Sequence, residues 1–206
     1  MNSDEKASLG LLAALVAMAL AGSAIDPFDR LTWWLEVAPV LMAAPVLWLT
    51  RRRWPLTPLL YTVIGVHALV LIVGGAYSYA RVPLGFWLQD AFELSRNPYD
   101  KIGHFFQGVT PALLAREILL RGGWLGRGRM LGFLAVCVAL AFSAFYELIE
   151  WAAALALGQG AEEFLGTQGD FWDTQSDMAM ALLGATLAVL LLGPKQDREL
   201  GKTGRG

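Results

Sequence analysis

Seven ionisable side chains in the second half of the chain are spaced so that they could form one site. They are Asp100, His104, Glu147, Glu150, Asp170, Asp173 and Asp177. Asp100 and His104 are four residues apart, a spacing that places both side chains on one face of a helix. Asp173 and Asp177 have the same spacing. The two glutamates are three residues apart, which is also a helical spacing, so three helices would each present acidic groups on one face.

Six carboxyl groups brought together in a low dielectric would repel one another strongly. Protonation, the neighbouring Lys101 or a bound cation could neutralise them. Oxygen ligands with one imidazole suit Mg²⁺, Mn²⁺, Ca²⁺ or Zn²⁺, so we expect a divalent cation. Its ligands would be Asp100, His104, Glu147, Asp173 and Asp177. Glu150 or Asp170 would then act as the catalytic base.

The composition requires an apolar solvent around most of the chain. Of the 206 residues, 56% are hydrophobic and 17% are charged, whereas a soluble domain carries about 25% charged residues. The mean hydropathy is +0.49. The apolar runs lack the period-two alternation of a barrel, and helices pair their own backbone groups in lipid. The sequence thus predicts an all-α, polytopic membrane helix bundle, a single domain over residues 1–194 that contacts the lipid bilayer and no nucleic acid.

Six segments are long and apolar enough to cross about 30 Å of hydrocarbon. They are Leu9–Ile25, Leu31–Thr50, Leu56–Tyr79, Ile102–Leu120, Met130–Leu157 and Thr174–Leu192. The first is interpreted as a retained helix, because the residues before it hold more acids than bases and make a poor signal-peptide start. The small residues Ala21–Ala24 leave cleavage open as an alternative.

Lysine and arginine residues predict the orientation of these spans. With the N-terminus inside, 12 of the 16 basic residues fall on the cytoplasmic side, including the run Arg51–Arg53. The remaining four are Arg30, Arg81, Arg96 and Lys101. We therefore predict that both termini are cytoplasmic and that residues 195–206 form a disordered cytoplasmic tail. The clustered acids then lie at the extracytoplasmic ends of their helices.

Several stretches resemble the YjdF-type inner-membrane proteins, a family without an established function. The longest runs from Asn97 to Gly108 and contains Asp100, Lys101 and His104. Further matching stretches are Arg116–Leu119, Glu147–Trp151, Leu165–Asp170, Trp172–Gln175 and Asp177–Met178. The resemblance covers most of the chain and implies a multi-pass protein of the bacterial inner membrane.

A looser similarity links the chain to VanZ-like membrane proteins, which are associated with glycopeptide resistance. Asp100, Lys101 and His104 match the Asp-Lys-x-x-His opening of that pattern. Later matching positions are Glu147, Asp173, Asp177 and Gly184. The arginine-bearing stretch and the asparagine of the VanZ-like pattern are absent here, which weakens the transfer of a resistance role.

Three functions remain open at the level of the sequence. The first is an outward-facing, cation-binding site that acts on a lipid-linked or envelope substrate; catalysis there would be metal-assisted hydrolysis or transfer at phosphate. The second is a proton-coupled transporter, and the third is a non-enzymatic scaffold whose polar contacts hold helices together. His67 is interpreted as a structural residue, and Arg116 with Glu117 as an interfacial charge pair. Neither a reaction nor an oligomeric state follows from the residues.

Overall fold

The computed structural model describes residues 3–157 and 167–202, and over these residues the elements are all helical. Residues 1–2, 158–166 and 203–206 lie outside the described part. The helices are α1 (Ser3–Ser23), α2 (Arg30–Thr50), α3 (Pro58–Tyr77), α4 (Pro83–Ala91), α5 (Tyr99–Arg121), α6 (Arg129–Leu157), α8 (Asp173–Leu187) and α9 (Gly193–Lys202). A π-helical turn, Ala188–Leu192, joins α8 to α9. The prediction of an all-α fold is confirmed.

Five helical segments in the described residues are long and apolar enough to cross a membrane. They are α1, α2, α3, α6 and the continuous run Asp173–Gly201. α5 has 23 residues, which is about 35 Å at 1.5 Å per residue, and is therefore also of spanning length. It is less apolar than the others because it carries charged residues, among them Asp100, Arg116 and Glu117. The structure thus supports five candidate spans by length and composition, against the six predicted.

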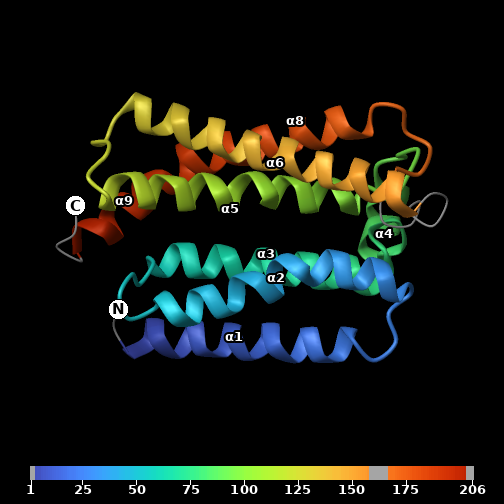
Figure 1. Cartoon of the computed structure of the whole chain (residues 1–206), viewed down its shortest axis with the longest axis horizontal. Coiled ribbons are helices and arrows are strands. Elements are labelled where there is room, and N and C mark those ends of the chain that lie inside the picture. Colours follow the sequence, from blue (N-terminus) through green and yellow to red (C-terminus); the bar gives the residue numbers. More distant parts are fainter. Residues whose placement is uncertain (1–2, 158–166, 203–206) are drawn as a thin grey trace.

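Two groups of helices make up the bundle (Figure 1). α1, α2 and α3 form one group, and α5, α6 and α8 form the other. α5 is central, because it packs against α3 as well as against α6 and α8. Both ends of the chain lie at one end of the bundle, and α4 lies at the opposite end. The start of α5, the end of α6 and the start of α8 all lie at the α4 end, so the acidic ends of the three helices come together.

Two glycines allow α5 and α8 to pack with their backbones in contact. A Cβ atom added at Gly108 of α5 would overlap the carbonyl oxygen of Ala181, and one added at Gly184 of α8 would overlap the carbonyl oxygen of Phe105. Small residues at such crossings let membrane helices approach closely. This close approach brings the aspartates at the start of α8 to the first turns of α5.

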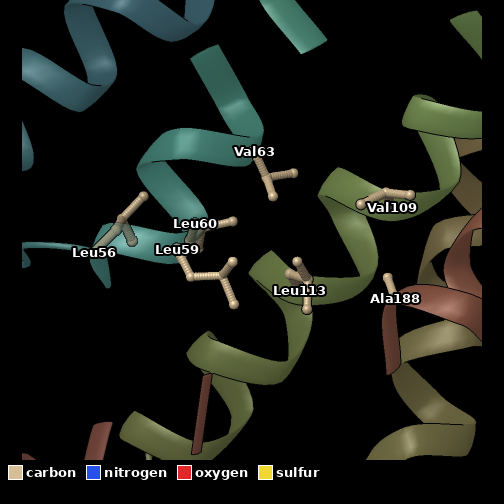
Figure 2. Close-up of a cluster of buried hydrophobic side chains, with 7 residues drawn as sticks. All are labelled: Leu56, Leu59, Leu60, Val63, Val109, Leu113 and Ala188. Atoms are coloured by element: carbon tan, nitrogen blue, oxygen red, sulfur yellow. The ribbon is translucent and has the colours of Figure 1, made fainter. Parts of the chain in front are cut away.

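A hydrophobic cluster joins the two groups of helices near the end where the chain termini lie (Figure 2). Its buried members are Leu56, Leu59, Leu60, Val63, Val109, Leu113 and Ala188. The side chains at the start of α3 lie opposite Val109 and Leu113 of α5. Within a membrane such contacts stabilise the bundle through close packing, since lipid tails are as apolar as leucine.

One face of α2 is buried against α3. Trp33 and Val37 form a cluster with Ile72 of α3. Glu36 precedes Val37 in the chain and is also buried, with 4% of its surface exposed. The packing of α2 on α3 therefore holds a carboxyl group inside the bundle.

The C-terminal segment differs from the prediction of a disordered tail over residues 195–206. α9 is helical to Lys202, and residues 203–206 lie outside the described part. Gln196 is fully buried and Leu200 is 2% exposed. Gln196 Nε2 donates a hydrogen bond to the carbonyl oxygen of Leu113 at 2.8 Å. Polar residues of this segment, whose composition suggests disorder, therefore form hydrogen bonds with α5.

Candidate metal centre

Asp100 and His104 on α5 and Asp177 on α8 form a buried group that could hold a metal ion. Each residue offers a ligand atom within 4.8 Å of those of the other two. His104 Nε2 lies 3.4 Å from Asp100 Oδ1 and 3.8 Å from Asp177 Oδ2. The three residues are 8%, 5% and 2% exposed, in chain order. The helical spacing within α5 and the close approach of α8 together produce this group.

Glu147 of α6 lies beside this group. Its Oε1 is 3.8 Å from His104 Nδ1, and the same nitrogen lies 2.9 Å from Gln107 Oε1. Glu150, nearly one turn further along α6, is partly buried and interacts electrostatically with Glu147 and His104. α6 thus places the carboxyl group of Glu147 beside His104 and that of Glu150 nearly one turn further along the helix.

Lys101 places a positive charge inside the site. Its Nζ donates to Asp177 Oδ1 at 2.6 Å and to Asp173 Oδ1 at 2.8 Å, and it lies 3.9 Å from Asp100 Oδ2. These bonds tie α5 to α8. Because Lys101 contacts Oδ1 of Asp177, the second oxygen of that carboxylate is left on the side of His104.

Asp173 and Asp170 lie together at Arg96, which precedes α5. Arg96 Nη2 forms an ion pair with Asp173 and another with Asp170 Oδ2, the latter at 3.1 Å. The Asp170 carboxylate also accepts a hydrogen bond from the backbone N–H of Trp172 at 2.8 Å, and its side chain is 32% exposed. Asp170 therefore belongs to the edge of the site, whereas Asp173 connects that edge to Lys101.

Two carboxylate oxygens of the site are buried without a hydrogen-bond partner in the described residues. They are Asp100 Oδ2 and Glu147 Oε1, and the hydroxyl oxygen of Ser143 on α6 is in the same condition. A buried polar group left unsatisfied costs about 1–3 kcal/mol, and folded proteins contain few of them. Carboxylate oxygens beside an imidazole are common metal ligands, so the group of Asp100, His104 and Asp177 could hold a metal ion.

Glu36 of α2 is a further acidic group of the site, and its spacing in the sequence does not reveal this. Its carboxyl group is hydrogen-bonded to the side chains of Tyr79 and Tyr146 and interacts electrostatically with His104. The rings of Tyr146 and His104 have centroids 6.4 Å apart. The indication of a role for Glu36 in the sequence is that it is the single acidic residue inside the otherwise apolar span Leu31–Thr50.

His67 of α3 lies between two helices rather than in this site. Its Nδ1 is 3.0 Å from Thr110 Oγ1, and its ring stacks on Phe106 with centroids 6.1 Å apart. Both partners belong to α5, so His67 links α3 to α5. This position agrees with the structural interpretation made from the sequence.

A second buried polar cluster lies at the opposite end of α5. Glu117 is fully buried and accepts hydrogen bonds from Thr57 Oγ1 at 2.8 Å and from Arg121 Nη1 at 2.9 Å. Arg116 is 6% exposed and pairs with Asp197 of α9 at 3.2 Å. The interpretation of Arg116 and Glu117 as an interfacial pair is therefore wrong. Adjacent residues of a helix point in different directions, so each finds its own partner.

Long apolar helices that enclose a cluster of acidic and histidine side chains define a helical integral membrane protein. The chain belongs to the family described as "Predicted membrane protein (DUF2238)", whose model matches residues 8–198. It is 57% identical to the "Inner membrane protein YjdF" of Escherichia coli (strain K12) over 196 residues, which cover 95% of this chain and 94% of that protein. The resemblance to the YjdF-type family is confirmed, and the looser VanZ-like similarity stays a prediction. No solved structure matches the chain.

Proposed function

We propose that the chain crosses the inner membrane six times, with both termini in the cytoplasm. Three observations support this topology: the spanning length of α5, the position of both chain ends at one end of the bundle (Figure 1), and the 12 of 16 basic residues that the sequence assigns to that side. The Escherichia coli relative is itself named an inner membrane protein. The acidic site then faces the extracytoplasmic side.

In that position we infer a divalent-cation site that acts on a lipid-linked substrate. Asp100, His104 and Asp177 would supply three ligands, and Glu147 a fourth. The observation that carries this proposal is that one buried oxygen of Asp100 and one of Glu147 have no hydrogen-bond partner in the described residues. An imidazole among carboxylates favours Mn²⁺ or Zn²⁺ over Ca²⁺, which takes about six to eight oxygen ligands.

The roles of two further residues follow from their ion pairs. Asp173, a metal ligand in the sequence prediction, is engaged by both Arg96 and Lys101. We assign it to holding Lys101 in place. Lys101 in turn offsets part of the carboxylate charge and leaves Asp177 Oδ2 directed to the histidine side of the site.

For a catalytic site, Glu150 is the better of the two predicted bases. Glu150 is partly buried and lies nearly one turn from Glu147, which is next to His104. Asp170, in contrast, is paired with Arg96 at the edge of the site. A bound divalent cation would supply an activated water and offset the negative charge of a phosphate group. Glu150 would then accept the proton of that water.

An apolar cavity of about 580 Å³ supports a substrate that carries a hydrocarbon chain. Its lining includes Pro39, Val40 and Leu47 of α2, Ile64 of α3, Leu114 of α5 and Phe142 of α6. Val40 lies about one helical turn from Glu36, so the lining of the cavity comes within about one turn of a carboxyl group of the site. A lipid chain in this cavity would place its polar end at the carboxylates.

A scaffold is the second candidate, because Lys101 and Arg96 join α8 to α5 and to the segment before it. A scaffold requires no cation, and this distinguishes it from the first proposal. A proton-coupled transporter has less support, since the acidic groups of the candidate metal centre lie at one end of the described helices and no chain of titratable groups in these helices links them to Glu117 at the other end.

Metal content tests the leading proposal. Protein purified in detergent would be incubated with Mn²⁺ or Zn²⁺, separated from free ion and analysed by mass spectrometry. We expect a stoichiometric ion in the wild type, its loss in Glu147→Gln and Asp177→Asn, and its retention in the matched control Asp170→Asn. Wild-type protein that holds no stoichiometric ion, and whose unfolding temperature is unchanged by a chelator, would support the scaffold instead.

A further inference from the structure

A second cavity, of about 630 Å³, lies between the start of α6 and the π-helical turn that precedes α9. It is at the end of the bundle where both chain termini lie, opposite to the candidate metal centre (Figure 1). Phe133 and Val136 of α6 and Val189 and Leu190 of the π-helical turn form its apolar wall. Its polar wall contains Arg116, Arg129 and Asp197. One cavity thus combines an apolar side with a charged side.

The charged side has an excess of guanidinium groups. Arg116 is 6% exposed and pairs with Asp197, but its Nε has no hydrogen-bond partner among the residues described. Arg127 Nε lies 3.5 Å from the same aspartate. Arg129, the first residue of α6, is exposed and also lines the cavity. Two arginines therefore pair with a single carboxylate, and Arg129 adds a positive charge to the wall of the cavity. Arginine is well suited to phosphate groups.

The backbone beside this cavity has two unusual features. A π-helical turn is rare and often marks a functional position. Gly193 follows it, and a Cβ atom there would lie 3.3 Å from Arg116 Cζ, so the glycine leaves room for the guanidinium group. Phe133 and Leu190 are 62% and 64% exposed on the surface of helical segments that are long and apolar enough to cross a membrane.

We propose that this cavity binds an anionic phospholipid, with its phosphate at Arg116 and Arg129 and an acyl chain along Phe133 and Leu190. The apolar wall distinguishes a lipid from a soluble anion, which would gain nothing from it. Basic pockets between membrane helices on the cytoplasmic side are known to hold anionic head groups. The proposal is independent of the metal centre at the other end of the bundle.

Lipid-dependent stability of the full chain in detergent tests this assignment. Phosphatidylglycerol should raise the unfolding temperature, and phosphatidylcholine or inorganic phosphate should not. Arg129→Gln should weaken the apparent affinity for phosphatidylglycerol about fivefold, the effect of one basic residue beside an anionic lipid. Arg52→Gln removes an exposed arginine from the same end of the bundle, away from the cavity, and should leave the affinity unchanged.

A second variant tests the apolar wall without altering any charge. Leu190→Gln should weaken phosphatidylglycerol binding, because it places an amide where the acyl chain lies. Equal stabilisation by phosphatidylglycerol and phosphatidylcholine would overturn the proposal. Equal effects of Arg129→Gln and Arg52→Gln would also overturn it, and protection by inorganic phosphate alone would show an anion site in place of a lipid site.

Discussion

The two ends of α5 carry buried charges under opposite conditions. At one end, the Glu117 carboxylate is surrounded by donors from Thr57, Arg121 and Gln196. At the other end, one oxygen of Asp100 and one of Glu147 are buried with no hydrogen-bond donor in the described structure. Burial of a charged group is therefore not by itself a sign of function in this molecule. The difference between the carboxyl groups lies in whether the protein supplies hydrogen-bond donors to them.

The balance of charge differs in the same direction. Around Glu117, Arg121 pairs with Glu117 itself and Arg116 pairs with Asp197, so each of these two arginines has a carboxylate partner. Around His104, the acidic groups outnumber the positive charges of Lys101 and Arg96. These acids are Glu36, Asp100, Glu147, Glu150, Asp170, Asp173 and Asp177. We infer that the first cluster stabilises the fold and that the second is built to bind a cation.

The largest effect is expected from Glu117→Gln. The change leaves Arg121 without its carboxylate partner and replaces one of the two oxygens that accept from Thr57, so the free energy of unfolding should fall by about 3–5 kcal/mol. Unfolding in detergent with increasing denaturant measures the loss, and Glu93→Gln at an exposed position is the matched control. A loss no larger than that of the control would remove the contrast between the two clusters.

A smaller effect is expected from Gly184→Ala. The added Cβ would overlap the carbonyl oxygen of Phe105, so α8 must move away from α5, at a cost of about 1–3 kcal/mol. The shift should also weaken cation binding, because it separates Asp177 from His104. Gly10→Ala on α1, where an added Cβ has open space, should change neither stability nor binding.

Lys101 sharpens the comparison through a double-mutant cycle. Lys101→Met removes the ammonium group that is bonded to Asp173 and Asp177, so it should lower stability. Adding Asp177→Asn should return part of the loss, with a coupling energy of about 0.5–3 kcal/mol. Additive effects of the two changes would show that the Lys101 pairs do not stabilise the site.

The smallest change in stability is expected from Asp100→Asn in metal-free protein. Its Oδ2 has no hydrogen-bond partner in the described part of the chain, and asparagine keeps an oxygen that can accept from His104 Nε2, which lies 3.4 Å from Asp100 Oδ1. Stability should therefore fall by only about 0.5–1.5 kcal/mol. The wild type should gain about 2.7 kcal/mol at a cation concentration of 100 times Kd, and this variant should gain far less. Thermal unfolding with and without the ion measures both effects. An equal gain in the two proteins would exclude Asp100 as a ligand.

Helical periodicity accounts for what the sequence could predict of the site. Asp100 with His104, and Asp173 with Asp177, are pairs within one helix, and their spacing alone places them on one face. The close approach of α5 to α8 depends on Gly108 and Gly184. Each of these glycines contacts the backbone of the other helix, and the sequence does not show this. The grouping of the acids at one end of the bundle could therefore be expected from topology. Topology does not predict which carboxylate oxygens lack a hydrogen-bond partner.

Partners from distant helices could not be predicted from spacing. Glu36 reaches the site from α2, far away in the chain, and only its isolation in an apolar span indicated a role. Arg116 finds Asp197 on α9, a segment whose polar composition suggests disorder. In both cases a buried polar group is paired through tertiary contacts, which local patterns do not encode.

X-ray absorption at the metal edge of Mn²⁺- or Zn²⁺-loaded protein tests the central claim most directly. We predict an inner coordination shell of oxygen ligands with one imidazole, and loss of the imidazole signal in His104→Gln. His67→Gln, which alters a histidine between α3 and α5, should leave the spectrum unchanged. A spectrum without imidazole, or one that His104→Gln does not change, would contradict the assignment of this cluster as a metal centre.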